Sequence, residues 1–258
     1  MRIVVKIGTS TLAYPTGRLN IRRMEHFCKV VSDLINAGHE IILVSSGAIG
    51  LGVGKLNLPS RPQDIPGKQA AAAVGQCELM YIYDKLFGEY NHTVAQLLIT
   101  AADVKDPARA INFENALFRL LEMKALPIIN ENDTIGTEEI VIGDNDTLAA
   151  IVAEGTHSQL LVLLSDINGF YTADPRKNPD ARLISQVEEV TPELEALAAD
   201  KGTSLGTGGM ITKLKAAKIV NAAGCQMVIA NGAEPEVLYD IVEGKPVGTR
   251  FMAKEVKE

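Results

Sequence analysis

The chain has 258 residues, of which 47% are hydrophobic and 22% charged, a balance typical of a globular protein with a full core. Its net charge of −7 and isoelectric point near 5.2 argue against a sequence-independent grip on nucleic-acid phosphates, so no nucleic-acid partner is expected. No run is long enough to span a membrane, and the N-terminus, with Lys6 inside its apolar run, does not resemble a signal peptide. Three widely spaced cysteines favour the reducing cytoplasm.

The chain begins with a short apolar run, Ile3–Gly8, that predicts a buried strand. Lys6 interrupts it, and a lysine near the carboxyl end of a parallel strand usually points into the ligand-binding crevice; an edge lysine that reaches water is the alternative. A helix is expected over Ile21–Ala37. A second strand, Ile41–Val44, leads into the Ser- and Gly-rich turn Ser45–Gly52, which either brings backbone N–H groups close to an anion or only packs tightly.

Residues 56–68 contain Pro59, Pro62 and Pro66, and this predicts a loop that is neither helix nor strand. The next expected elements are helices over Lys68–Tyr83 and Asn112–Lys124 and strands over Val94–Thr100 and Leu126–Ile129.

Two clusters of carboxylates and amides follow the last of these strands. The first is Asn130–Asp133, and the second is Gly143–Asp146, which opens a predicted helix over Leu148–Glu154. Either cluster alone fits turn or N-cap chemistry. Both together, at the ends of buried elements, suit an amine, a carboxylate or a hydrated magnesium ion.

The second half repeats the alternation of strand and helix. A strand over Leu160–Leu164 ends in Ser165–Gly169, and the glycine-rich stretch Gly202–Gly209 feeds a helix, Met210–Ala223, that carries Lys213. Such a loop before a helix N-terminus is a ready anion site, although a linker before a surface helix has the same composition. The remaining expected elements are a short helix over Glu193–Ala199, a strand over Cys225–Ala230 and a helix over Glu236–Ile241.

This alternation predicts an α/β fold, a three-layer αβα sandwich with a mainly parallel central sheet in a single domain over 1–258. Lys6, the glycine turns and Lys213 can neutralise a polyphosphate, while the Asp/Asn clusters can hold a small polar acceptor. Those are the parts of a phosphoryl-transfer site. No His lies in these turns, which disfavours acyl hydrolysis, and no dinucleotide fingerprint is present.

In this order the motifs resemble those of the glutamate 5-kinases, members of the amino acid kinase family, over essentially the whole chain. They are Val4–Ser10, Ser45–Ile49, Lys68–Gln69, Ala72–Gln76, Asn130–Asp133, Gly143–Asp146, Tyr171–Arg176, Gly206–Met210, Thr212–Lys213 and Val247–Phe251. The resemblance implies ATP-dependent phosphorylation of the γ-carboxylate of L-glutamate, the first step of proline biosynthesis.

The same resemblance implies roles for individual residues. Lys6 and Lys213 would contact the ATP phosphates, and Asp144 and Asp146 would lie beside the transferring phosphate, either as magnesium partners or as organisers of the lysines. The residues expected to line the nucleotide site are Lys6, Ser165, Asp166, Thr207, Gly208, Gly209, Met210, Ile211, Thr212 and Lys213. Those expected to bind glutamate are Ser46, Asp133 and Asn145. About 1–155 would then form a glutamate-binding half and about 156–258 an ATP-binding half.

ATP with Mg²⁺ is the expected co-substrate, without a tightly bound organic cofactor. The resemblance also implies that the chain forms a homo-oligomer, either a dimer or a tetramer. Proline is expected to act as a feedback inhibitor. The chain stops seven residues after Phe251, without the C-terminal PUA-type domain of many members, so RNA binding is not expected. The alternatives are an acetylglutamate kinase, an aspartokinase, a uridylate kinase or a non-catalytic amino-acid sensor, which would tolerate loss of a phosphate-site lysine.

Overall fold

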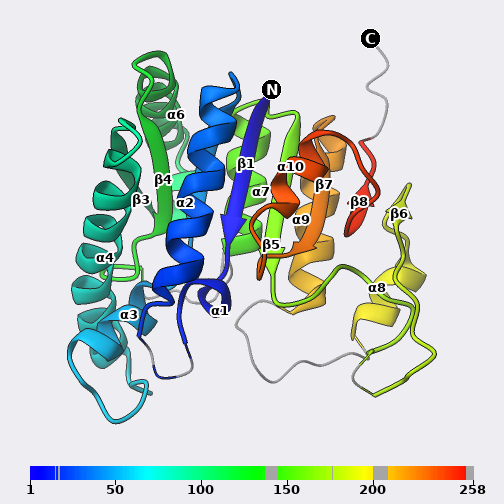
Figure 1. Ribbon diagram of the computed structural model, residues 1–258, viewed down its shortest axis with the longest axis horizontal. Helices are drawn as coiled ribbons and strands as arrows, with labels where there is room; N and C mark the ends of the chain where they lie inside the picture. Colours follow the sequence, from blue (N-terminus) through cyan, green and yellow to red (C-terminus); the bar gives the residue numbers. More distant parts are fainter. Residues whose placement is uncertain (15, 17, 137–144, 176, 200–208, 254–258) are drawn as a thin grey trace.

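The computed structural model describes residues 1–14, 16, 18–136, 145–175, 177–199 and 209–253. These residues form one sheet of eight strands in the order β3-β4-β2-β1-β5-β7-β8-β6 (Figure 1). Its strands are β1 Arg2–Ile7, β2 Glu40–Ser45, β3 Val94–Ile99, β4 Leu126–Glu131, β5 Leu160–Ser165, β6 Gln186–Val187, β7 Gln226–Asn231 and β8 Thr249–Phe251. Paired strands are parallel except for β7 and β8, which confirms the mainly parallel sheet.

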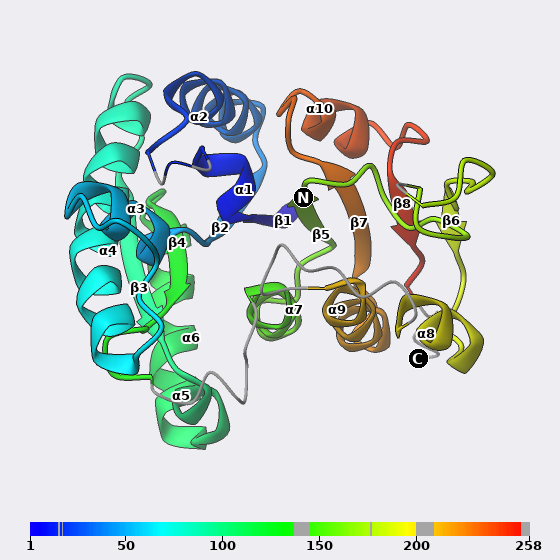
Figure 2. The ribbon, with the colours of Figure 1, turned by 90° about the horizontal axis from the view of Figure 1, so that it is seen from below.

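Helices cover both faces of this sheet, as the alternating pattern predicts. The helices are α1 Thr9–Leu12, α2 Ile21–Asn36, α3 Ala48–Lys55, α4 Ile65–Gly88, α5 Ala101–Lys105, α6 Pro107–Glu122, α7 Asn145–Gly155, α8 Pro192–Ala199, α9 Met210–Ala222 and α10 Val237–Val242. Figure 2 shows α2 and α10 on one face and α6, α7 and α9 on the other. The αβα layering expected from the sequence is therefore confirmed.

The central strands contribute side chains to two hydrophobic cores, one on each face of the sheet. Val4 packs into the core beneath α7 and α9, whereas Val5 packs into the core beneath α2 and α4. Successive side chains of a strand point to opposite faces, so Lys6 lies on the same face as Val4. The two-residue period of β1 thereby directs this lysine toward α7 and α9.

The strand order places a topological switch beside β1. From β1 the chain moves to β2 on one side and later returns to β5 on the other, and β1 pairs in parallel with both. In open α/β sheets, ligands bind outside the carboxyl ends of the strands at such a point. In Figure 1 this edge is the lower one, beside α1 and α3.

The proline-rich loop predicted over residues 56–68 is wrong for its last residues, because α4 already begins at Ile65. The Asp64 side chain accepts a hydrogen bond from the Gly67 N–H at 2.8 Å and caps the helix, and Pro66 lies in the first turn, where a missing N–H costs little. The helix then continues to Gly88, beyond the predicted end at Tyr83. A proline marks a helix start here as readily as a loop.

The Ser- and Gly-rich turn after β2 contains a helix that the sequence did not predict. Gly47 adopts φ +105°, which favours glycine, and α3 follows directly. A Cβ on Gly75 of α4 would lie 1.7 Å from the carbonyl oxygen of Ala48, and a Cβ on Gly52 would lie 1.8 Å from that of Ala71. These glycines therefore allow α3 and α4 to pack backbone against backbone.

Candidate active site

Asp146 lies at the centre of the site, completely buried in the first turn of α7. Its Oδ1 lies 2.6 Å from Lys6 Nζ of β1, and its Oδ2 lies 2.8 Å from Lys213 Nζ of α9. Both lysines are buried, with 8% and 4% of their surface exposed. We call Lys6, Asp146 and Lys213 the lysine–aspartate triad; with two ammonium groups and one carboxylate it carries a net charge of +1.

The electrostatics of the triad keep its carboxylate ionised. Burial by itself would raise the pKa of Asp146, but the ammonium groups of Lys6 and Lys213, which also donate hydrogen bonds to it, outweigh burial and hold the pKa well below its usual range. Asp146 thus holds two lysines from distant segments, one from β1 and one from α9, side by side at the switch point.

The lowered pKa of Asp146 predicts a specific loss of stability in acid. A carboxylate whose folded pKa lies below its unfolded value near 3.9 stabilises the fold above that value, and this stabilisation is lost as the pH falls through the folded pKa. For Asp146→Asn we expect the slope of unfolding free energy against pH below about pH 4 to be shallower by up to about 1.4 kcal/mol per pH unit. Urea unfolding between about pH 2 and pH 5 measures it, and equal slopes in wild type and variant would contradict it.

Asn145, the preceding residue of α7, connects the triad to a second polar group. Its Nδ2 donates to Ser46 Oγ at 2.8 Å and to Asn130 Oδ1 at 3.0 Å. Asn130 in turn donates from Nδ2 to Gln76 Oε1 at 2.9 Å. We call Ser46, Gln76, Asn130 and Asn145 the amide cluster; it joins the ends of β2 and β4 to α4 and α7.

The remaining residues predicted for glutamate and ATP lie along the same edge of the sheet. Asp133 lines a small hollow with Gln76, just beyond the end of β4. Ser165 ends β5, beside β1 in the sheet, and donates to the carboxylate of the exposed Asp166 at 3.1 Å. The structure thus brings Ser46 and Asn145 into contact and places Asp133 and Ser165 at the ends of nearby strands.

The N-terminus of α9 carries the other described residues predicted for the nucleotide. Gly209 is its N-cap, and Met210 and the 44%-exposed Ile211 begin the helix. The Thr212 hydroxyl donates to the Gly209 carbonyl oxygen at 2.6 Å and lies 3.3 Å from Asp146 Oδ2. Asp144, Thr207 and Gly208, like most of the predicted glycine-rich loop, lie outside the described residues.

Two members of the amide cluster had been given no role from the sequence. Asn130 and Gln76 both lie in motifs noted above, but nothing in the spacing of 54 residues between them indicates contact. Only the pairing of β4 with the sheet, together with the length of α4, brings them together. A buried polar residue in an apolar helix pattern, as Gln76 is in α4, was the available signal.

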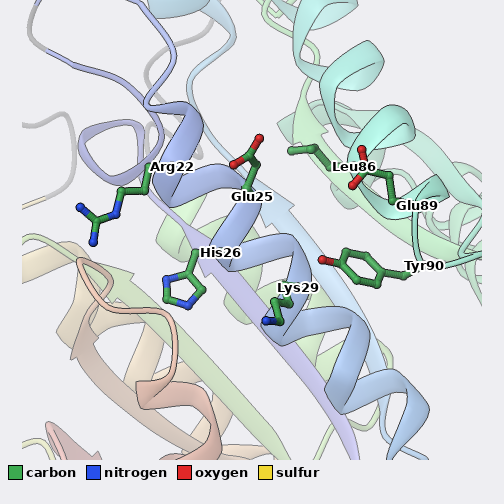
Figure 3. A pocket seen from close by; sticks show the side chains of 7 residues that line it. All are labelled: Arg22, Glu25, His26, Lys29, Leu86, Glu89 and Tyr90. Atoms are coloured by element: carbon green, nitrogen blue, oxygen red, sulfur yellow. The ribbon is translucent and has the colours of Figure 1, made fainter.

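A larger hollow lies on the opposite face of the sheet from α7 and α9. Figure 3 shows its lining side chains, which project from α2 and from the end of α4: Arg22, Glu25, His26, Lys29, Leu86, Glu89 and Tyr90. Side chains of both charges line it, and no residue of the triad or of the amide cluster is among them. This hollow is a charged surface groove that is separate from the candidate active site.

Comparison with known proteins shows the family to which the chain is similar. Residues 1–231 match the amino acid kinase family. A glutamate 5-kinase of Clostridium perfringens is 51% identical over 258 residues, covering 98% of this chain and 96% of that one. A glutamate 5-kinase of Clostridium tetani is 53% identical over 251 residues, covering 97% and 94%.

The chain belongs to the amino acid kinase family, in its glutamate 5-kinase branch. A UMP kinase structure from Bacillus anthracis superposes on this amino acid kinase with a TM-score of 0.68 over 98% of this chain and 96% of that one. At 18% sequence identity that likeness concerns the fold alone. None of the described helices of this kinase combines the length and apolarity that a membrane span requires.

Proposed function

We propose that the chain transfers the γ-phosphoryl group of ATP to the γ-carboxylate of L-glutamate, giving L-glutamyl 5-phosphate and ADP, the first step of proline biosynthesis. The observation that carries the proposal is the lysine–aspartate triad, with Asp146 at 2.6 and 2.8 Å from two buried ammonium groups. Buried cationic groups fixed before the substrates arrive are what stabilises charge in phosphoryl transfer.

The acceptor needs no general base in this reaction. A glutamate side chain has an unperturbed pKa near 4.3, so at neutral pH it is already a nucleophilic carboxylate. The obstacle is the repulsion between that anion and the triphosphate. Lys6 and Lys213 would relieve it by contacting the phosphates, and Asp146 would hold both ammonium groups in place.

The two substrates would enter from the two halves of the chain. Ser46, Asp133 and Asn145, within residues 1–155, would bind glutamate. Ser165, Asp166 and the segment from Thr207 to Lys213, within residues 156–258, would line the nucleotide site. Asn145 and Asp146 are consecutive residues of α7, with contacts in the amide cluster and in the triad respectively. This adjacency supports a reaction centre between the halves.

Mg²⁺ is proposed to accompany ATP, and it would neutralise charge on the β- and γ-phosphates. Carboxylate oxygens are the ligands that Mg²⁺ prefers, but both oxygens of Asp146 already contact ammonium groups. Of the two roles expected for Asp146, this favours organiser of the lysines over metal ligand. The ion would then be held mainly by the nucleotide.

Asp133→Ala is expected to raise the KM for glutamate about 10-fold or more, because a charge-assisted hydrogen bond to the substrate would be lost. The KM for ATP should stay unchanged, since the nucleotide is proposed to bind in the other half. Steady-state kinetics with each substrate varied in turn measure both constants, with Asp180→Ala, in an exposed turn, as the matched control. A variant in which only the KM for ATP moves would contradict the assignment of the halves.

The decisive experiment measures ADP release from MgATP with L-glutamate, N-acetylglutamate, aspartate and UMP, with hydroxylamine present to trap an acyl phosphate. Hydroxamate with L-glutamate alone is the expected result. Turnover with another acceptor would refute the glutamate assignment. ATP binding without turnover on any acceptor would indicate an amino-acid sensor of the same fold.

We further propose a cytoplasmic enzyme that assembles as a homodimer or homotetramer and is inhibited by proline. The cysteines support a cytoplasmic location. Cys28, Cys77 and Cys225 are all free thiols, as is usual for proteins of a reducing compartment. Light scattering of the purified protein tests the assembly, and the rate of hydroxamate formation with added proline tests the inhibition.

A further inference from the structure

Gln76 is a buried polar residue of α4 that no role assigned above uses. Only 8% of its surface is exposed, and its Oε1 accepts a hydrogen bond from Asn130 Nδ2 at 2.9 Å. Its Nε2 is buried and has no hydrogen-bond partner within the part of the chain that the structure describes. Buried donors in native proteins are almost always satisfied, so this atom indicates a partner that the described residues do not supply, such as a bound ligand.

The orientation of this side chain follows from a backbone group. The N–H of Glu131 can only donate, and it donates to the side chain of Asn130 at 2.9 Å, so the atom it contacts must be Oδ1. The other end of Asn130 is then Nδ2, which requires Gln76 to present Oε1 to it. Nε2 is the atom of Gln76 that remains available for a ligand.

The hollow lined by Gln76 restricts the chemistry of that ligand. Nε2 is a donor only, so the ligand must offer an acceptor such as a carboxylate oxygen. The hollow measures about 10 Å³, which accommodates one oxygen-sized group. Glu131 and Asp133 also line it, and their carboxylates disfavour a purely anionic ligand while favouring one that carries an ammonium group beside the acceptor.

We propose that Gln76 is a specificity-determining residue, whose Nε2 donates to an oxygen of the α-carboxylate of the substrate amino acid. Asp133, in the same hollow, pairs with the α-ammonium group. This inference rests on the proposed function and assigns one α-carboxylate oxygen of glutamate to this hollow. A nucleotide acceptor, which has no α-ammonium group, does not match this arrangement of one neutral donor among carboxylates.

Gln76→Glu tests the proposal, because it keeps an acceptor for Asn130 Nδ2 and replaces only the donor by an oxygen of similar size. We expect the KM for L-glutamate to rise about 30-fold, the loss of one hydrogen bond to a charged group, with kcat and the KM for ATP nearly unchanged. Gln63→Glu, the same substitution at an exposed position before α4, is the matched control and should behave as wild type.

Two truncated analogues separate recognition from a structural role. Glutarate keeps both carboxylates, so its inhibition constant should rise in Gln76→Glu as the KM for glutamate does. γ-Aminobutyrate lacks the α-carboxylate, and its inhibition constant should not rise. Equal losses for glutamate and γ-aminobutyrate would mean that Gln76 only positions Asn130, and an unchanged KM for glutamate would also overturn the proposal.

A measurement on the wild type keeps the proposal testable if the variant does not fold. In a crystal structure with L-glutamate, an α-carboxylate oxygen should lie within about 3.2 Å of Gln76 Nε2. A water or a protein group in that position would overturn the assignment. Hydroxamate formation by the wild type tests the proposed function separately, and calorimetric binding of L-glutamate tests Gln76 even if no hydroxamate forms.

Discussion

Lys213→Ala is expected to lower kcat at least about 100-fold, and Lys6→Ala by a similar factor, because each removes one preorganised cation from the charge that develops during transfer. The two ammonium groups lie 2.8 and 2.6 Å from the oxygens of one buried carboxylate, so neither surface lysines nor solvent can replace them. Removal of both should cost far less than the product of the single effects, since the triad acts as a unit.

Lys215→Ala is the matched control for this prediction. Lys215 belongs to the same helix, two residues after Lys213, but is exposed to solvent. Its loss should leave kcat within about threefold of wild type, as is usual for a solvated surface charge. Hydroxamate assays at saturating glutamate and MgATP measure kcat, and thermal melts confirm that each variant is folded. Near-normal turnover in folded Lys213→Ala or Lys6→Ala would contradict the proposed role of the triad.

Gly75→Ala is expected to destabilise the fold by about 3 kcal/mol or more, because the added Cβ has no space. It would lie 1.7 Å from the Ala48 carbonyl oxygen and 2.5 Å from the Gly52 nitrogen, both of them backbone atoms that no rotamer change can move away. For a chain of this size the melting temperature should fall by roughly 6–12 °C. The KM for glutamate should rise as well, since displacement of α3 also moves Ser46, two residues before Ala48.

Gly88→Ala provides the control on the same helix. Gly88 is the last residue of α4, and a Cβ placed there would meet no atom within 4 Å. Alanine favours helix more than glycine does, so this variant should melt at or slightly above the wild-type temperature. If Gly75→Ala and Gly88→Ala melt at the same temperature, the close packing of α3 against α4 is not what requires glycine at position 75.

In the proposed reaction, Asn145 and Asp146 would allow one helix to serve both substrates. Neighbouring residues of a helix point in different directions, about 100° apart at 3.6 residues per turn. Asn145 therefore reaches Ser46 and Asn130, while Asp146 reaches Lys6 and Lys213. The first turn of α7 thus contacts residues at the ends of β1, β2 and β4. We expect the acceptor and the transferring phosphate to meet there.

The sequence by itself determined the fold class, the central strands and the family. Period and apolar content identify a buried parallel strand such as Leu160–Leu164 because burial on both faces requires apolar residues throughout. Lys6 was predicted as a site residue because a lysine near the carboxyl end of a parallel strand usually points into the ligand-binding crevice. The short strands β6 and β8, two and three residues long, were missed because so short a segment has no measurable period.

Only the tertiary structure decided which side chains meet. The sequence allowed Asp146 to be a cap, a metal ligand or an organiser of lysines, because a carboxylate suits all three. Its burial between residues 6 and 213 follows from the order of β2, β1 and β5 and from the packing of α7 against α9. Gln76 and Asn130 are 54 residues apart in the sequence, and only the packing of α4 and β4 in the fold brings them into contact. Local patterns fix local structure, whereas a site built from distant segments depends on strand order and helix packing.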